Sequence, residues 1–256
     1  MDENTARIQR AFTAQAQGFE SPRMNFAKRD YLTHLITCTQ PSPTDRFLEV
    51  AAGTCACGRA FAPHLQSVTC FDMTEAMLAI GRAEAQKAGL TNLSFIQGNA
   101  ETLPFADSTF DIVLSRLAIH HFPNPQRCVA EMARVLKPGG KLVLIDMEAT
   151  EESLRSTEDA IETLRDPSHI RNPSRAELEA LFASNAIRLT YQDCHEIPVD
   201  LSAWLTLTHT PAEVAAVITH RLTAELAGGP KTGLFPYKKG ENLAFNQHWL
   251  LLIGQK

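Results

Sequence analysis

Short apolar runs alternate with segments of helical periodicity between residues 46 and 146. An apolar run of four or five residues between turn signals suits one buried strand, whereas apolar positions recurring every three or four residues indicate a helix packed against a sheet. Alternation of the two is typical of a parallel sheet with crossover helices. The predicted strands cover residues 47–50, 68–71, 93–96, 110–114 and 141–145.

Turn and cap residues mark two of the intervening helices. Thr74 is suited to the N-cap of the first helix, and Gly89 to its end. The second helix begins at Asn124 and Pro125, an N-cap followed by proline in the first turn. Both helices therefore have a predicted start.

After residue 146 the elements become longer. A polar helix is predicted over 150–165, and Ser174 with Glu177 forms a capping box at the start of the next helix. Residues 187–199 and 242–253 alternate partly between apolar and polar positions. That alternation predicts an antiparallel strand pair at one edge of the sheet.

Composition and charge favour a globular protein that works on small molecules. The chain has 256 residues, of which 44% are apolar and 21% charged, close to average globular usage. The net charge is −5 and the longest Lys/Arg cluster is a pair, so we expect no nucleic-acid partner. The N-terminus lacks an apolar leader and no apolar run has membrane length, so we expect a cytoplasmic protein without membrane insertion.

The residues 49–58, EVAAGTCACG, follow the first predicted strand and form what we call the 49–58 loop. In open α/β sheets, ligands bind beyond the carboxyl ends of the strands, and an acidic residue about 20 positions after the first turn takes ribose hydroxyls. Gly53 lies in this turn, and Asp72 follows 19 positions later. Glu49 would repel a pyrophosphate but can accept hydrogen bonds from an ammonium group. The charge favours a cofactor with a cationic end.

Four motifs in order, EVAAGTC, FDMTEAML, GNAETLPFADSTFDIVLSRLAIHHF and ARVLKPGGKLVLID, resemble those of class I S-adenosylmethionine-dependent methyltransferases. The resemblance is closest to the ubiquinone/menaquinone C-methyltransferase-like and YcgJ-like branch, and it covers residues 8 to 255. It implies an α/β Rossmann-like fold with a seven-stranded, mostly parallel sheet, an antiparallel edge pair, helices on both faces and a helical lid. The implied cofactor is S-adenosylmethionine, with S-adenosylhomocysteine as the product.

The resemblance also implies a division of one domain over residues 1–256. The implied parts are N-terminal helices over 1–40, a cofactor-binding core over 41–147, a substrate-side region over 148–241 with a helical lid from about 200, and a last strand over 242–256. A homodimer is compatible with this organisation.

The cofactor contacts implied by the resemblance follow the motifs in sequence order. The methionine end is expected at Glu49, Ala51, Gly53 and Cys55, the ribose at Asp72, the adenine at Met73, Asn99, Ala100 and Glu101, and the sulfonium above Ser115 and Leu117. Asn99 replaces the usual aspartate of the family, but its amide oxygen can still accept a hydrogen bond from the adenine amine.

Ala51 and Cys55 occupy positions where the family has glycine. Glycine permits positive φ, which alanine and cysteine adopt only with strain. We predict that the 49–58 loop keeps negative φ at both positions, so that cofactor binding is retained.

Two adjacent histidines are the catalytic candidates. His120 and His121 follow the fourth predicted strand, where the substrate should meet the methyl group, and a histidine there can act as a general base at neutral pH. The alternative is that they only bond the loop backbone. His120 is the better candidate. Arg116 can orient an anionic substrate group or pair with Asp111.

Further substrate contacts are expected in the substrate-side region. His169 and Arg171 lie in a loop rich in recognition-capable side chains, or simply in a capped linker. Trp204 in the lid can line the substrate pocket or pack the lid onto the core. Phe12 and Phe19 can similarly close over the cofactor or belong to the core.

We predict in-line methyl transfer to a small acceptor, which requires no metal. Three alternatives remain. A dinucleotide-dependent oxidoreductase would keep the fold, and a non-catalytic cofactor-binding protein would explain the changed loop. The third is a thiol or metalloid methyltransferase that uses Cys55 and Cys57 with Cys70. The simpler interpretation of these cysteines is that they are small buried side chains that fill space in the core.

Overall fold

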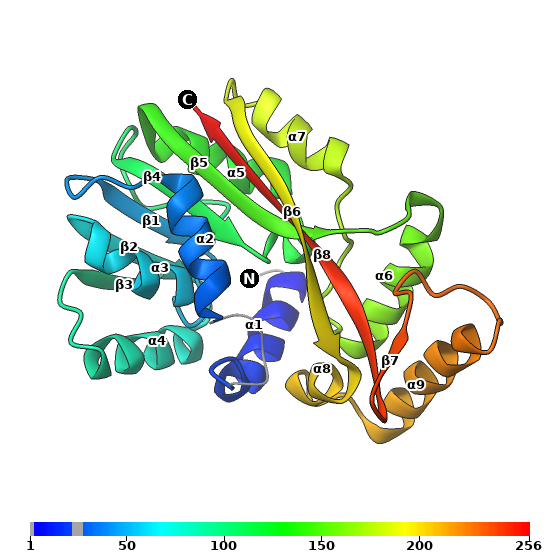
Figure 1. The fold of residues 1–256 in the computed structure, drawn as a ribbon. Coiled ribbons are helices and arrows are strands. Elements are labelled where there is room, and N and C mark those ends of the chain that lie inside the picture. The colour runs from blue at the N-terminus through cyan, green and yellow to red at the C-terminus, as the bar shows by residue number, and fades with distance from the viewer. Residues whose placement is uncertain (1–2, 22–27) are drawn as a thin grey trace.

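A computed structural model describes residues 3–21 and 28–256. Within these residues, eight strands form one sheet in the order β3-β2-β1-β4-β5-β8-β6, and β7 pairs with β8 beside this path (Figure 1). The strands are β1 (Arg46–Val50), β2 (Ser67–Asp72), β3 (Leu93–Gln97), β4 (Phe110–Arg116), β5 (Leu136–Glu148), β6 (Arg188–Asp200), β7 (Tyr237–Lys239) and β8 (Asn242–Gln255).

The sheet has the predicted mixed architecture. Strands β3, β2, β1, β4 and β5 are parallel, β8 runs antiparallel to β5, and β6 runs antiparallel to β8. The seven-stranded path with an antiparallel edge pair is confirmed, and β7 is an additional short strand. Chain order reverses between β1 and β4, which creates the switch point where open α/β sheets bind ligands.

Helices cover both faces of the sheet. They are α1 (Glu3–Gln15), α2 (Arg29–Thr39), α3 (Ala56–Phe61), α4 (Glu75–Lys87), α5 (Pro125–Val135), α6 (Arg155–Arg165), α7 (Arg175–Ala183), α8 (Leu201–Leu207) and α9 (Ala212–Leu226). One buried cluster joins α2, α3 and α4 to the sheet, and a second joins α5 and α7 to the other face (Figure 1). Adjacent residues of β1 belong to different clusters: Phe47 packs in the first cluster and Leu48 in the second. Burial on both faces explains the continuous apolar runs.

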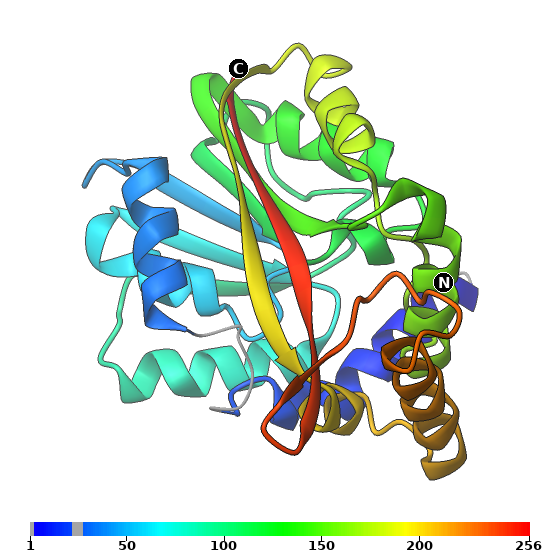
Figure 2. The same ribbon diagram turned by 45° about the vertical axis from the view of Figure 1, so that its right-hand side comes forward.

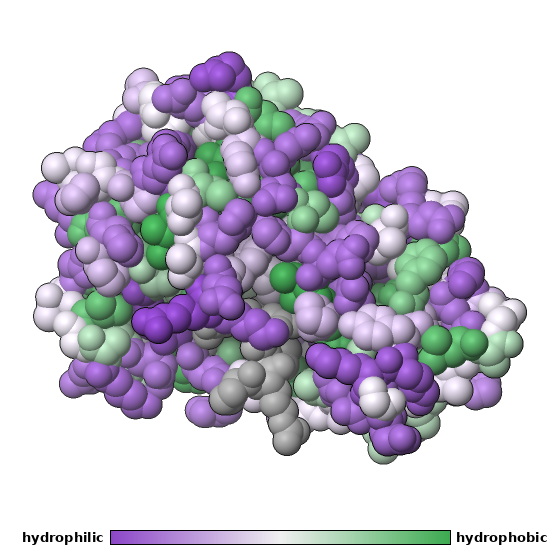
Figure 3. Space-filling view, viewed as in Figure 1, coloured by the Kyte–Doolittle hydropathy of each residue, from purple (hydrophilic) through white to green (hydrophobic). Residues whose placement is uncertain are grey.

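The edge strands β6 and β8 extend as a long two-stranded ribbon that leads to the helical lid (Figure 2). A third buried cluster at the end of this ribbon contains Trp204 of α8, Ile218 of α9, Phe245 of β8 and Ile161 of α6. The lid therefore has its own apolar core and is attached to the sheet through paired strands. In the view of Figure 3 the surface is mostly hydrophilic, with apolar residues scattered over it.

The predicted caps are mostly present. Asn124 accepts from the backbone N–H of Arg127, and Ser174 with Glu177 forms the full capping box. Thr74 does occupy the N-cap position of α4, but its hydroxyl makes no capping bond. Its backbone N–H instead donates to Asp72 (2.7 Å), so the residue helps to fix the end of β2. Over the described residues, every helix is too short or too polar to cross a membrane.

Candidate active site

A cavity lies where the parallel strands end, between the sheet and two covering helices. Glu49, Asp72 and Leu117 line it from the ends of β1, β2 and β4. Phe12 of α1 and Trp204 of α8 line it from the other side. The position is the switch-point crevice that the fold provides for ligands.

Helix α1 is attached to both sides of this cavity. The side chain of Gln9 donates to the backbone oxygen of Met73 (3.1 Å), and Gln15 donates to Asp166 (3.1 Å). Residues Phe12 and Phe19 both line the cavity, with the Phe12 ring edge-on to His121. The N-terminal segment thus forms part of the site.

The 49–58 loop contradicts the prediction of negative φ. Ala51 has φ 54° and Cys55 has φ 61°, both in the left-handed region, as does Gly53 at 52°. Hydrogen bonds explain why: the N–H of Ala52 donates to Phe71 (3.0 Å), and the N–H of Cys55 donates to the carbonyl of Ala52 (2.7 Å). These bonds hold the turn against a strain of about 1–2 kcal/mol for each L-residue. The loop keeps the glycine-type conformation at positions 51 and 55 although neither residue is glycine.

The side chain of Cys55 points into the core rather than the cavity. It is fully buried, its Sγ lies 3.6 Å from the carbonyl oxygen of Gly53, and it packs against α4 at Gly81. A Cβ at Gly81 would lie 2.9 Å from this sulfur and 2.7 Å from the carbonyl oxygen of Thr54. Gly81 therefore permits the close approach of α4 that encloses the thiol.

The thiol and metalloid alternative is not supported. Burial raises the pKa of Cys55, raises that of Cys57 to about 12, and also raises that of Cys70, so thiolates are disfavoured. In the part of the chain that the structure describes, these three cysteines belong to no group of three potential metal ligands. They are small buried side chains that fill the corner beneath the loop.

Glu49 is a buried carboxylate at the end of β1. Its Oε2 accepts from the N–H of Gly58 (2.7 Å), and a Cβ at Gly58 would lie 2.9 Å from that oxygen. Burial raises the pKa of Glu49 to about 7, although the Gly58 N–H and the charge of Arg116 oppose this. A cation bound beside Glu49 would favour its ionised form.

Asp72 joins the ends of β1 and β2. Its two carboxylate oxygens accept from the N–H of Gly53 (2.8 Å) and the N–H of Thr74 (2.7 Å), while burial raises its pKa. The next strand end contributes Asn99, whose Oδ1 accepts from the N–H of Glu101 (2.9 Å). Asp72 and Asn99 line the cavity together with Met73, Ala100 and Glu101.

His120 forms a buried pair with Asp146 on the cavity wall. The Nδ1 of His120 lies 2.5 Å from Oδ1 of Asp146, whose oxygens also accept from the N–H groups of Ala118 (3.0 Å), Ile119 (2.6 Å) and Met147 (2.8 Å). Burial lowers the pKa of His120, but the charge and hydrogen bond of Asp146 outweigh it, and the pKa is raised. The pKa of Asp146 is correspondingly lowered. This carboxylate orients the imidazole.

His121 has a different environment although it also lines the cavity. Its Nδ1 lies 3.0 Å from the carbonyl oxygen of Ser168, and burial together with repulsion from His120 lowers its pKa to about 3. His121 is therefore neutral, and it connects the loop after β4 to the loop after α6.

The proposed substrate contacts are only partly brought together. Arg116 lines the cavity with its guanidinium 6.0 Å from the Trp249 ring, and Asp111 pairs instead with Lys137 (2.7 Å). Trp204 lines the cavity as well, with Arg165 over its ring at 4.4 Å.

Five of the predicted site residues lie outside the cavity lining, namely Gly53 and Cys55 of the 49–58 loop and the three residues described next. His169 is buried behind His120, with its Nε2 2.9 Å from Asp159. Arg171 is exposed and pairs with Glu177 (2.8 Å), so it lies away from the cavity in which a substrate contact was expected. Ser115 is buried below the cavity floor because side chains alternate along β4.

Residues 48–144 match the family model described as a methyltransferase domain. The uncharacterised methyltransferase YcgJ of Bacillus subtilis is 35% identical over 213 residues, 82% of this chain and 83% of that protein. The chain belongs to the class I S-adenosylmethionine-dependent methyltransferases. The solved structure of YcgJ superposes with a TM-score of 0.80 at 30% identity, covering 90% of this chain and 99% of YcgJ. A Bacillus halodurans protein assigned as a methyltransferase gives 0.81 at 27% identity, covering 89% and 99%.

The sequence analysis missed two residues of this methyltransferase site. Asp146 directly follows the apolar run 141–145, and a carboxylate at a strand end was a signal for the partner of His120. Trp249 lines the cavity from β8 on the edge ribbon. Only the antiparallel return of that strand brings it beside the parallel strand ends, so no local pattern could place it.

Proposed function

We propose that this methyltransferase transfers a methyl group from S-adenosylmethionine to a small acceptor whose nucleophilic oxygen or carbon must lose a proton. The His120–Asp146 pair on the cavity wall is the observation that carries the proposal. The acceptor lies between the parallel strand ends and the helices α1 and α8.

The residues at the strand ends fit the cofactor. Glu49 places a buried carboxylate where the ammonium end belongs, and the left-handed turn at Ala51 and Gly53 bends the backbone around that end. Asp72 is positioned for the ribose hydroxyls, and Asn99 to Glu101 for the adenine. When bound, the cofactor supplies an electrophilic methyl group on a sulfur that leaves as a neutral thioether.

His120 is proposed to remove the proton of the acceptor. Because Asp146 holds Nδ1, the other ring nitrogen, Nε2, is left to accept a proton from a group in the cavity. His121 has too low a pKa to hold that proton near neutral pH, so its role is to position the loop. The two adjacent histidines therefore have different proposed roles because their environments differ.

Trp204 is proposed to bind the acceptor. Its Nε1 is buried and has no hydrogen-bond partner among the described residues, although the side chain lines the cavity. A buried indole N–H normally has a partner, so an oxygen of the acceptor is a suitable one. Arg116 on the opposite wall suits an acidic group of the same molecule.

Cofactor binding is tested first by calorimetry with S-adenosylhomocysteine and, separately, with NAD. We expect the wild type to bind S-adenosylhomocysteine only, and Asp72→Ala to lose this binding while the exposed control Asp107→Ala keeps it. Binding of NAD alone would instead support the oxidoreductase alternative.

Methyl transfer is then assayed as S-adenosylhomocysteine release with a panel of phenols, enolisable ketones, carboxylic acids, amines and thiols. We expect turnover with a phenol or an enolisable ketone, and a kcat lower by about 10²-fold or more in His120→Asn with unchanged cofactor affinity. Turnover that is unaffected by His120→Asn would refute the proposed base.

A further inference from the structure

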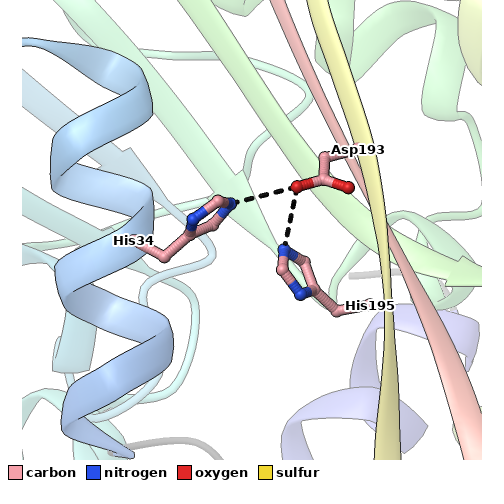
Figure 4. A group of neighbouring side chains, drawn as sticks. All are labelled: His34, Asp193 and His195. Atoms are coloured by element: carbon pink, nitrogen blue, oxygen red, sulfur yellow. Dashed lines mark ion pairs between the residues drawn. The ribbon is translucent and has the colours of Figure 1, made fainter.

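Three potential metal ligands meet away from the cavity, between helix α2 and the edge strand β6 (Figure 4). The Nε2 of His34 and the Nε2 of His195 each lie 3.2 Å from Oδ2 of Asp193. The three ligand atoms all lie within 4.8 Å of one another. Asp193 and His195 are two positions apart on β6, so both side chains point to the face that α2 covers.

We propose that His34, Asp193 and His195 bind a divalent transition-metal ion of the zinc type. Imidazole nitrogens and a carboxylate oxygen are ordinary zinc ligands, with bonds of about 2.0–2.2 Å. In tetrahedral geometry such bonds place neighbouring ligand atoms roughly 3.4 Å apart. The two observed separations of 3.2 Å therefore need little adjustment to hold the ion.

The present contacts leave this group open to a cation. The Nε2 of His195 is buried and has no hydrogen-bond partner within the described residues, even though Asp193 is close. Asp193 is oriented from outside by Tyr191, whose hydroxyl donates to Oδ2 (3.1 Å), and by the N–H of Cys194, which donates to Oδ1 (2.8 Å). Partners of this kind hold metal-binding carboxylates in position.

A second group of potential metal ligands, on strands β5, β6 and β8, is less suited to a cation. It comprises Glu148, Cys194 and His248. The two carboxylate oxygens of Glu148 accept from the guanidinium of Arg175 at 2.7 and 3.2 Å, so a positive charge already occupies that side. The ion pairs that Asp193 forms within the described residues are, in contrast, with the two histidines.

Cys38 lies one helical turn from His34, with its Sγ 3.5 Å from Nε2 of that histidine. It is not a member of the three-atom group, so we assign three protein ligands and a fourth position to water. Cobalt(II) distinguishes this arrangement from one in which Cys38 is the fourth ligand. Thiolate ligation adds a charge-transfer band that nitrogen and oxygen ligands do not produce.

The ion would connect α2 to β6 and support the cavity wall. Tyr31 of α2 lies edge-on to the rings of both His195 (5.5 Å) and Trp249 (5.3 Å). Trp249 lines the cavity. We therefore assign the ion a structural role, independent of the methyl transfer itself.

The test uses the full chain, stripped with a chelator and titrated with ZnCl2 by calorimetry and by thermal unfolding. We expect one ion per chain and a Tm increase of about 5 °C at a hundredfold excess over Kd. His34→Gln and His195→Gln should each weaken zinc binding by more than about 100-fold, since even outer-shell changes cost 10–100-fold. Each variant is compared with its own metal-free Tm, so reduced folding stability does not obscure the result.

Two matched controls fix the location of the ion. His248→Gln removes a histidine from the second group and should leave zinc affinity unchanged, as should Cys38→Ser, and the cobalt(II) protein should show no thiolate band. The proposal fails if the wild type binds no zinc, if both glutamine variants bind it as the wild type does, or if His248→Gln abolishes binding. A thiolate band lost in Cys38→Ser would overturn the three-ligand assignment.

Discussion

Replacing Ala51 by glycine should stabilise the protein, which is unusual for an alanine-to-glycine change. Ala51 has φ 54°, a conformation that costs an L-residue about 1–2 kcal/mol relative to the right-handed region. Glycine removes this strain but adds unfolded-state entropy of about 0.4–1 kcal/mol. The side chain of Ala51 is half-buried, so little packing is lost. The expected net gain in the free energy of unfolding is about 0.5 kcal/mol.

The adjacent position provides the matched control. Ala52 is buried and is not among the positive-φ residues, so Ala52→Gly loses packing and entropy without relieving strain. We expect it to lower the free energy of unfolding by about 1 kcal/mol. Urea unfolding without cofactor measures both variants, with equal m-values as the condition for comparison. Equal destabilisation by the two substitutions would show that Ala51 is not strained and would refute the left-handed loop.

Three further predictions concern the same site. Gly81→Ala should destabilise the protein by roughly 1–3 kcal/mol in urea unfolding, because the new Cβ would lie 2.7 Å from the carbonyl oxygen of Thr54; an unchanged midpoint would mean that α4 moves freely. Trp204→Phe should raise the KM of the acceptor while kcat changes little, since it removes the buried N–H and keeps the aromatic packing; an unchanged KM would exclude the indole as a ligand. The raised pKa of His120 and the lowered pKa of Asp146 predict that their mutual stabilisation is complete between about pH 4 and 6.5. This stabilisation should fade as pH rises through the raised histidine pKa or falls through the lowered aspartate pKa. In urea unfolding, His120→Asn should remove the loss of stability on the alkaline side. If that loss persists in the variant, another group causes it.

The sequence predicted the sheet because burial on both faces imposes continuous apolar runs, which are a local signal. The starts of the capped helices were also predictable, because a cap residue bonds backbone groups within the first turn of its own helix and is therefore a local signal. The long edge ribbon was also predicted from its partial alternation. What the local pattern lacked was the packing of α8 against that ribbon and the attachment of α1 to the loop after α6, which depend on contacts between residues far apart, such as Gln15 with Asp166.

The site was predictable where a strand end carried a polar residue, and unpredictable where the decisive feature was a hydrogen bond. The 49–58 loop is the clearest case. From composition alone, alanine and cysteine argue for negative φ. The bond from the N–H of Ala52 to Phe71 on the neighbouring strand, and the burial of the Cys55 thiol against Gly81, impose the opposite conformation. Glycine is therefore not required at positions 51 and 55 of this turn. Tertiary contacts can hold an L-residue at a positive φ that its own conformational preference disfavours.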